Sequence, residues 1–134
     1  MADKEKNTAF RGCILLVDDD EVILEACGWM LVRRGFDVFK ARNGKEAVEV
    51  FERYQDRIDL VILDIQMPVM DGESTFYCLR QMEPGVRVLL ISGYSDTGCV
   101  ERLLQNGCKG FLQKPFNVKD LTDKIEAIQV EHYA

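Results

Sequence analysis

The sequence CILLVDDDE, residues 13–21, places five apolar residues directly before four carboxylates. An uninterrupted apolar run of this length is typical of a β-strand that is buried on both faces of a parallel sheet. Carboxylates crowded this closely repel one another, and their pKa values rise unless a cation keeps them ionised. The stretch therefore predicts a central strand and, at its carboxyl end, a site that requires positive charge.

The rest of the chain repeats this alternation of strand and helix. The apolar runs 59–63 and 86–92 predict two more central strands, whereas residues 36–41 and 109–113 are more polar and suit the edges of a sheet. Apolar residues at helical spacing follow each strand. The expected helix faces are Ile23, Ala26, Met30 and Leu31; Ala47, Val50, Phe51 and Tyr54; Phe76, Leu79 and Met82; Val100, Leu103 and Leu104; and Val118, Leu121, Ile125 and Ile128.

This strict alternation predicts the fold class. Parallel strands are joined by right-handed crossover connections, so the helices cover both faces of the sheet. The three apolar strands belong at its centre. We therefore predict an α/β, flavodoxin-like (βα)5 fold with a five-stranded parallel sheet of order 2-1-3-4-5. We expect this single domain to cover residues 12–130, between a poorly ordered lead-in of residues 1–11 and a tail of residues 131–134.

Several polar residues stand where helices are expected to begin. Asp20 and Glu21 suit the N-terminus of the first helix, where the helix dipole favours negative charge. Residues 43–46, Asn-Gly-Lys-Glu, resemble a capping box. Ser95 or Asp96 provides a cap for the helix that follows the fourth strand.

Composition excludes several classes of function. The net charge of −6 argues against direct binding to nucleic acid or to an anionic membrane surface. No apolar run approaches the roughly 18 residues of a membrane-spanning helix, so we expect no membrane insertion. The single histidine, His132, excludes histidine-based metal sites and catalytic triads. The five cysteines include no C-x-x-C pair, which predicts reduced thiols in a cytoplasmic protein.

Polar residues gather where the strands end. In a sheet of this kind, sites form beyond the carboxyl ends of the strands. Asp18 and Asp19 follow the first strand, Asp64 follows the third, Ser92 ends the fourth and Lys114 follows the fifth. Alone, each residue has a structural interpretation as a helix cap, a turn former or a solvated lysine. Together they predict an oxygen-ligand site for a hard divalent cation, most naturally Mg²⁺ with Mn²⁺ as a substitute, and for phosphoryl transfer to a carboxylate.

The chain resembles the receiver domains of two-component response regulators, and in particular those associated with hybrid histidine kinases. The resemblance covers about residues 12–130. It rests on the motifs DDDE at 18–21, LDIQMPVMDG at 63–72, ISGYSD at 91–96 and KGFLQKPF at 109–116. It implies a Mg²⁺-dependent phosphoacceptor that is phosphorylated and dephosphorylated by its own catalysis, not an enzyme.

The resemblance also implies a role for each matching residue. The implied roles are phosphoacceptor for Asp64; Mg²⁺ binding by Asp19, Asp64 and the backbone carbonyl of Gln66, and by Asp18 through water; contact with the phosphoryl oxygens for Ser92 and Lys114; and switching for Ser92 and Phe111. Phe111 stands where the family commonly has Tyr, so its outward state lacks a hydroxyl group. Gln66, two residues after the acceptor, implies a changed lifetime of the phosphorylated state. The Lys114–Pro115 bond is implied to be cis, and Gly93 is implied to leave room for the phosphoryl group.

The implied partners are proteins. No donor histidine lies on a predicted core helix, so a histidine kinase or a phosphotransfer protein must supply the phosphoryl group. A downstream protein would bind the surface of the fourth helix, fifth strand and fifth helix, residues 96–130. We expect a monomer or a weak homodimer. The start at Met1 favours a stand-alone protein over the receiver piece of a longer chain.

Three other functions fit these residues less well. A Mg²⁺-dependent phosphatase with an aspartyl nucleophile usually carries a second Asp two positions on, where this chain has Gln66. A flavin-binding electron carrier needs a Ser/Thr/Gly-rich phosphate loop after the first strand, where the carboxylates would repel the phosphate. An unphosphorylated pseudo-receiver would not need the complete set of Asp18, Asp19, Asp64, Ser92 and Lys114.

Overall fold

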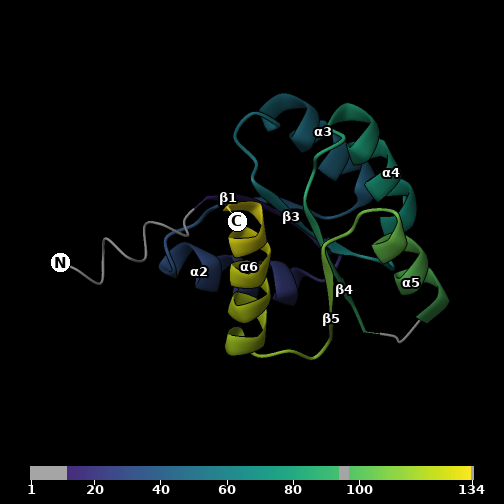
Figure 1. Cartoon of the computed structure of the whole chain (residues 1–134). Coiled ribbons are helices and arrows are strands. Elements are labelled where there is room, and N and C mark those ends of the chain that lie inside the picture. Colours follow the sequence, from purple (N-terminus) through teal and green to yellow (C-terminus); the bar gives the residue numbers. More distant parts are fainter. Residues whose placement is uncertain (1–11, 94–96, 134) are drawn as a thin grey trace.

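The computed structural model describes residues 12–93 and 97–133, except for the side chains of residues 97 and 130–133. Strands and helices alternate along the chain (Figure 1). Their bounds are β1 Cys13–Val17, α2 Glu21–Arg33, β2 Asp37–Ala41, α3 Gly44–Tyr54, β3 Leu60–Asp64, α4 Gly72–Met82, β4 Val88–Ser92, α5 Thr97–Gln105, β5 Gly110–Gln113 and α6 Val118–Tyr133. The strands form one parallel sheet in the order β2-β1-β3-β4-β5, which confirms the predicted topology.

The register of the sheet brings the carboxyl ends of its central strands to one edge. Val17, the last residue of β1, is aligned with Leu63 of β3, and Asp64 is aligned with Ile91 of β4. Ser92 is in turn aligned with Gln113, the last residue of β5. The residues that follow β1, β3, β4 and β5 therefore begin close together.

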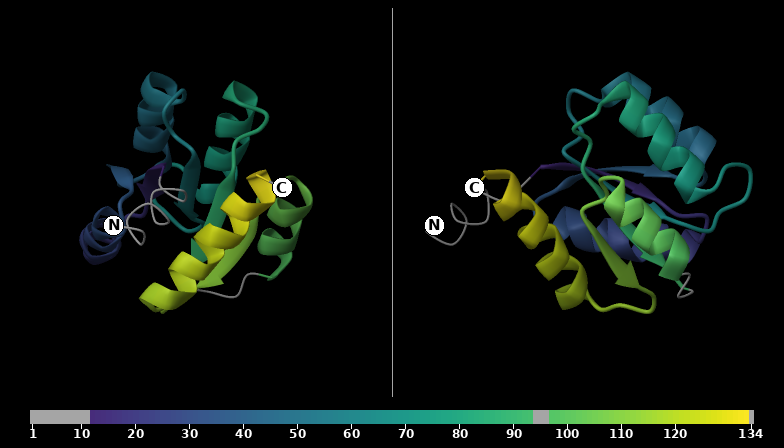
Figure 2. Two further views of the ribbon diagram at one scale, coloured as in Figure 1. Left: turned by 60° about the vertical axis from the view of Figure 1, so that its left-hand side comes forward. Right: turned by 45° about the vertical axis from the view of Figure 1, so that its right-hand side comes forward.

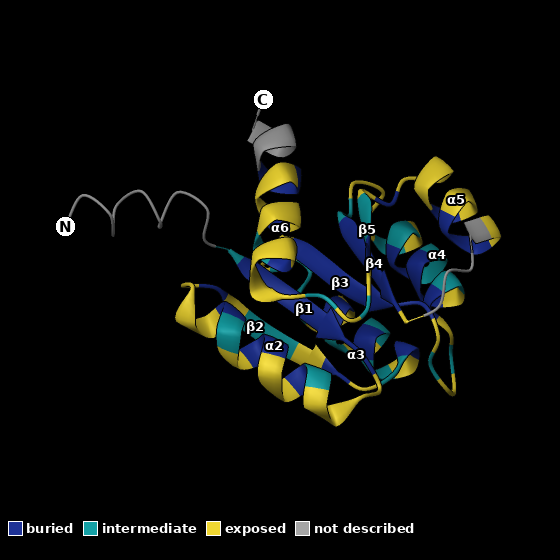
Figure 3. Ribbon diagram, turned by 90° about the horizontal axis from the view of Figure 1, so that it is seen from below, coloured by how far each residue is buried: buried dark blue, intermediate teal, exposed yellow. Residues whose placement is uncertain are grey.

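Two apolar clusters hold the helices against the two faces of the sheet (Figure 2). One cluster joins the sheet to α3, α4 and α5 through buried residues such as Phe51, Phe76 and Leu103. The other joins it to α2 and α6 through residues such as Leu31 and Leu121. Every residue of β1, β3 and β4 is buried (Figure 3), and their burial provides most of the hydrophobic stabilisation of the sheet.

The predicted face of the first helix was partly wrong. The buried residues of α2 are Leu24, Cys27, Gly28 and Leu31, whereas Ala26 is exposed. Apolar residues occur all around this helix, including the exposed Val22, Trp29 and Val32, so their spacing did not identify the face that packs on the sheet. Leu104 and Val118, at 38% and 37% exposure, also lie at the rims of their helix faces and not in the core.

The helix caps agree with the expectations where the structure describes them. The Asp20 carboxylate accepts a hydrogen bond from the backbone N–H of Val22 at 2.9 Å. The Asn43 side chain accepts one from the Glu46 N–H at 2.9 Å, while Glu46 accepts from the N–H of Arg42. Ser95 and Asp96 lie outside the described residues, as does the lead-in of residues 1–11. The last helix continues to Tyr133, past the expected boundary at residue 130.

Candidate functional site

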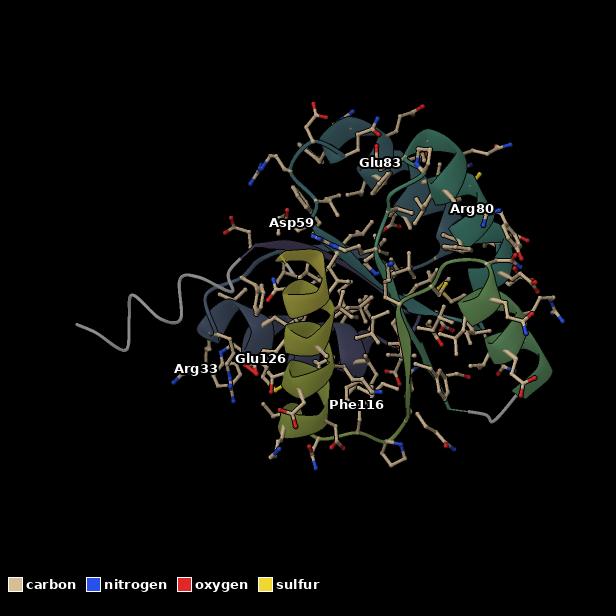
Figure 4. The ribbon with its side chains drawn as sticks, in the orientation of Figure 1. Arg33, Asp59, Arg80, Glu83, Phe116 and Glu126 are labelled. Atoms are coloured by element: carbon tan, nitrogen blue, oxygen red, sulfur yellow. The ribbon has the colours of Figure 1, made fainter. Side chains whose placement is uncertain are left out.

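The predicted site residues stand at the carboxyl edge of the sheet. Asp18 follows β1 directly, Asp64 is the last residue of β3, and Ser92 is the last residue of β4. Lys114 follows β5, and Phe116, just beyond it, lies where β5 connects to α6 (Figure 4). Asp18, Asp64 and Ser92 are buried, with 0%, 3% and 1% of their surface exposed.

Asp18 and Lys114 form the polar centre of the site. The Nζ of Lys114 lies 2.7 Å from Oδ2 of Asp18 and 3.5 Å from Oδ2 of Asp64. The other oxygen of Asp18, Oδ1, accepts a hydrogen bond from the backbone N–H of Asp20 at 2.9 Å. One ammonium group is therefore shared between two buried carboxylates that belong to neighbouring strands. The Lys114–Pro115 peptide bond is cis, as the resemblance implied.

Asp19 completes a cluster of carboxylates. One oxygen from each of Asp18, Asp19 and Asp64 can be chosen so that all three lie within 4.8 Å of one another. Asp19 is exposed, whereas its two neighbours in the cluster are buried, so the cluster opens to solvent on one side. Three oxygen donors at this spacing, with an open side for water or phosphate, fit the coordination that Mg²⁺ prefers.

The surroundings of Asp64 disfavour ionisation of its carboxyl group. Burial of the carboxyl group, and next the charge of Asp18, raise the pKa of Asp64 from 3.8 to about 7. The charge of Lys114 and a hydrogen bond from the backbone of Gln66 act in the opposite direction. Burial lowers the pKa of Lys114, but its contacts with Asp18 and Asp64 outweigh this effect, and the pKa is raised. Lys114 is therefore charged at neutral pH and does not by itself balance the carboxylates.

Two glycines shape the surroundings of Asp64. The N–H of Gly72 donates to the carbonyl of Ile65 at 2.8 Å, and a Cβ at residue 72 would lie 2.4 Å from the carbonyl oxygen of Asp64. Only glycine allows α4 to begin this close to the end of β3. At Gly93, by contrast, a Cβ would meet no atom within 4 Å, so Gly93 itself is bordered by open space.

The structure brings most of the predicted residues together. Asp18, Asp64 and Lys114 are in direct contact, and Asp19 joins them in the cluster. Gln66 is exposed, and its backbone bonds the Asp64 carboxyl group. Phe111 is half-buried in β5, aligned with Leu90, and packs against the cluster that contains α4 and α5.

Three features near the site were not predicted. Cys27 is buried in α2, and after burial the charge of Asp18 is the next cause that raises the pKa of its thiol. Val69, in the loop between β3 and α4, has a positive φ of 70°. An ion pair joins Glu73 of α4 to Arg102 of α5. The positive φ has no sequence signal at a valine, and residues 29 positions apart on different helices give none for the ion pair.

The described residues contain no helix that is both long and apolar enough to cross a membrane.

Residues 14–126 match the model of the response regulator receiver domain family. The chain is 33% identical over 124 residues to the sensor kinase CckA of Brucella abortus, covering 91% of this chain. It spans only 13% of the length of that curated relative.

Solved structures show the same relationship. The CheY chain of the CheX–CheY–BeF3–Mg²⁺ complex of Borrelia burgdorferi superposes with a TM-score of 0.84 at 28% identity, covering 87% of this chain and 88% of that one. The receiver domain of the hybrid histidine kinase CckA gives a TM-score of 0.74 at 31% identity, covering 87% and 97%. The chain therefore belongs to the response regulator receiver domain family, whose members are phosphoacceptors in two-component signalling.

Proposed function

We propose that Asp64 accepts a phosphoryl group from a phosphohistidine and that Asp18, Asp19, Ser92 and Lys114 support the transfer. The observation that carries this proposal is the placement of Asp64. The residue is 3% exposed, at the end of a central strand, with two further carboxylates close by and the Lys114 ammonium 3.5 Å from its carboxylate. A nucleophile, cation ligands and a fixed positive charge are thus in one place.

The carboxylate cluster fits Mg²⁺, with Mn²⁺ as a substitute. The side chains of Asp19 and Asp64 and the backbone carbonyl of Gln66 would bind the ion, with Asp18 acting through water. The raised pKa of Asp64 supports this assignment, because burial and the charge of Asp18 disfavour the ionised carboxylate and a bound cation would favour it. A bound divalent cation supplies charge neutralisation for the carboxylates and for the phosphoryl oxygens.

The chain's own residues account for the transfer. A carboxylate oxygen of Asp64 attacks phosphorus and forms the new P–O bond while the P–N bond to the donor imidazole breaks. The imidazole leaves with the electron pair of that bond and takes a proton from solvent. Lys114, held 2.7 Å from Asp18, would offer its positive charge to the transferred group, and the Ser92 hydroxyl would donate a hydrogen bond to it.

Partners follow from this chemistry. The donor would be a histidine kinase or a phosphotransfer protein, because the chain contains a single histidine, His132, at the end of its last helix. The signal would leave through α5, β5 and α6, the elements that follow Ser92 and carry Phe111. A protein partner is in keeping with the solved Borrelia burgdorferi complex, which contains CheY together with BeF3, Mg²⁺ and a second protein, CheX. The free thiols fit a cytoplasmic site of action.

The test is phosphorylation by acetyl phosphate, followed by intact-mass measurement. We expect one phosphoryl group on the native protein with Mg²⁺ and none with EDTA, and none on Asp64→Ala in either buffer. Asp20→Asn is the matched control, because Asp20 lies at the same edge of the sheet but its side chain caps α2, and Asn is an equally good cap. Equal labelling without Mg²⁺, or labelling of Asp64→Ala, would contradict the proposal.

A further inference from the structure

Polar side chains tie α5 to α4, and the charged one, Arg102, belongs to the last turn of α5. The Nε and Nη2 of Arg102 donate to the two carboxylate oxygens of Glu73 at 2.8 and 3.0 Å, so the ion pair is bidentate. The Sγ of Cys99 lies 3.7 Å from the same carboxylate. We call the Glu73–Arg102 pair the latch.

The far end of α5 has its own ties to α4. The side-chain amide of Asn106, just after α5, donates to the hydroxyl of Tyr77 at 2.9 Å. Arg80, which projects from α4 (Figure 4), donates to the backbone carbonyl of Asn106. The ion pair from the last turn of α5 and the two hydrogen bonds of Asn106 thus hold the second half of this helix against α4.

The latch joins the two helices that border the acceptor. Glu73 is in the first turn of α4, next to Gly72. The N–H of Gly72 donates to the carbonyl of Ile65, and its Cα lies close to the carbonyl of Asp64. Arg102 is in α5, which follows Ser92 along the chain. One partner is thus fixed to the strand that carries the phosphoacceptor, and the other belongs to the segment that leads away from Ser92.

We propose that the latch holds α5 against α4 in the unphosphorylated state and thereby lowers the affinity of the site for a phosphoryl group. This inference rests on the proposed function. When Ser92 is drawn toward phosphoryl oxygens, α5 would shift relative to α4 and separate Arg102 from Glu73. An interaction present in only one of two states shifts their balance by its own free energy. Exposed or half-exposed ion pairs are worth enough to shift an equilibrium about two- to five-fold.

Both side chains of the latch are partly exposed, which suits a contact that can break. The Glu73 side chain is 28% exposed and that of Arg102 is 53% exposed, so both groups can be solvated once they separate. The pair lowers the pKa of Glu73 through the hydrogen bonds from Arg102. Separation leaves no buried unpaired charge, unlike separation of Lys114 from Asp18, and the latch can open without unfolding the domain.

The test compares the affinities of the native protein and its variants for beryllofluoride in excess Mg²⁺. Each affinity is measured by NMR titration of the full chain. Glu73→Gln removes a negative charge and Arg102→Gln a positive one, so simple electrostatics would move the affinity for an anion in opposite directions. The latch predicts that both variants bind about two- to five-fold more tightly. The double variant keeps the net charge of the native protein, and it should gain no more than either single variant because both break the same contact.

Two controls complete the experiment. Lys119→Gln with Asp123→Asn removes an exposed pair of 2.7 Å within α6 without a change of net charge, and its affinity should equal that of the native protein. Glu73→Arg with Arg102→Glu re-forms the pair in reverse and should restore the native affinity. An unchanged double variant, or opposite effects of the two single variants, would overturn the latch while leaving the proposed function intact. Failure of the native protein to bind beryllofluoride would overturn both.

Discussion

Replacing Asp64 with Asn should stabilise the protein at alkaline pH when Mg²⁺ is absent. In the native protein, 3% of the surface of Asp64 is exposed, and this residue lies beside Asp18, which is fully buried. Among the described residues, Lys114 alone brings an ammonium group within 4 Å of both. Asn has nearly the same shape and no charge, so the substitution removes the repulsion and the desolvation of one carboxylate while leaving the packing unchanged.

The pKa of Asp64 sets the size and the pH range of this effect. A rise from 3.8 to about 7 corresponds to about 4 kcal/mol, which is an upper limit. Asn also loses the attraction of Lys114 and weakens the bond from Gln66, so we expect a gain of about 1–3 kcal/mol. The native state binds the Asp64 proton more tightly than the unfolded state does. The stability that this proton provides is complete below about pH 4 and is lost as pH rises through about 7.

The assay is urea unfolding followed by circular dichroism, with EDTA, at pH 8 and pH 5.5. Asp64→Asn should be more stable than the native protein at pH 8, with a smaller difference at pH 5.5. Mg²⁺ should narrow the difference by stabilising the native protein more than the variant. Asp56→Asn, at an exposed position, is the matched control and should change the free energy of unfolding little. A variant that is less stable at pH 8 in EDTA would refute the idea that the cluster lacks positive charge.

Four further substitutions test local features of the structure. Val69→Asn should raise the free energy of unfolding by about 0.5–1 kcal/mol, because Asn tolerates the φ of 70° better than a β-branched residue; thermal unfolding that shows no gain would mean that the loop relaxes without strain. Gly72→Ala should destabilise by about 1–3 kcal/mol in urea unfolding, since its Cβ would overlap the Asp64 carbonyl, whereas Gly93→Ala, with open space around it, should be neutral. Lys114→Gln should destabilise more at pH 8 than at pH 5.5 in EDTA, because it leaves Asp18 beside Asp64 without a cation; equal losses at both pH values would contradict that pairing.

Much of the fold can be predicted from the sequence because the strands and turns carry strong local signals. Apolar runs as long as 13–17 fit only a strand covered on both faces, and residues such as Asn43 and Gly72 mark where helices begin. Strand order then follows from polarity, since β2 contains exposed residues and β1 contains none. The packed face of α2 was harder, because Val22 and Trp29 are apolar and exposed.

The candidate site was predictable to a different extent. Topology places strand ends together, so the proximity of Asp18, Asp64 and Lys114 follows from the strand order alone. What the topology does not determine is how one ammonium group is shared, 2.7 Å from one carboxylate and 3.5 Å from the other. Contacts between helix surfaces, such as Glu73 with Arg102, depend on helix rotation and rotamers, which hydrophobic periodicity does not encode.

Phosphoryl transfer from a P–N bond to Asp64 is the central claim, and phosphoramidate tests it most directly. The native protein is incubated with phosphoramidate and Mg²⁺, and the modified residue is located by peptide mass spectrometry. We predict a single acyl phosphate, on Asp64, that disappears when EDTA replaces Mg²⁺. A phosphoryl group on another residue, or on Asp64 to the same extent in EDTA, would contradict the account.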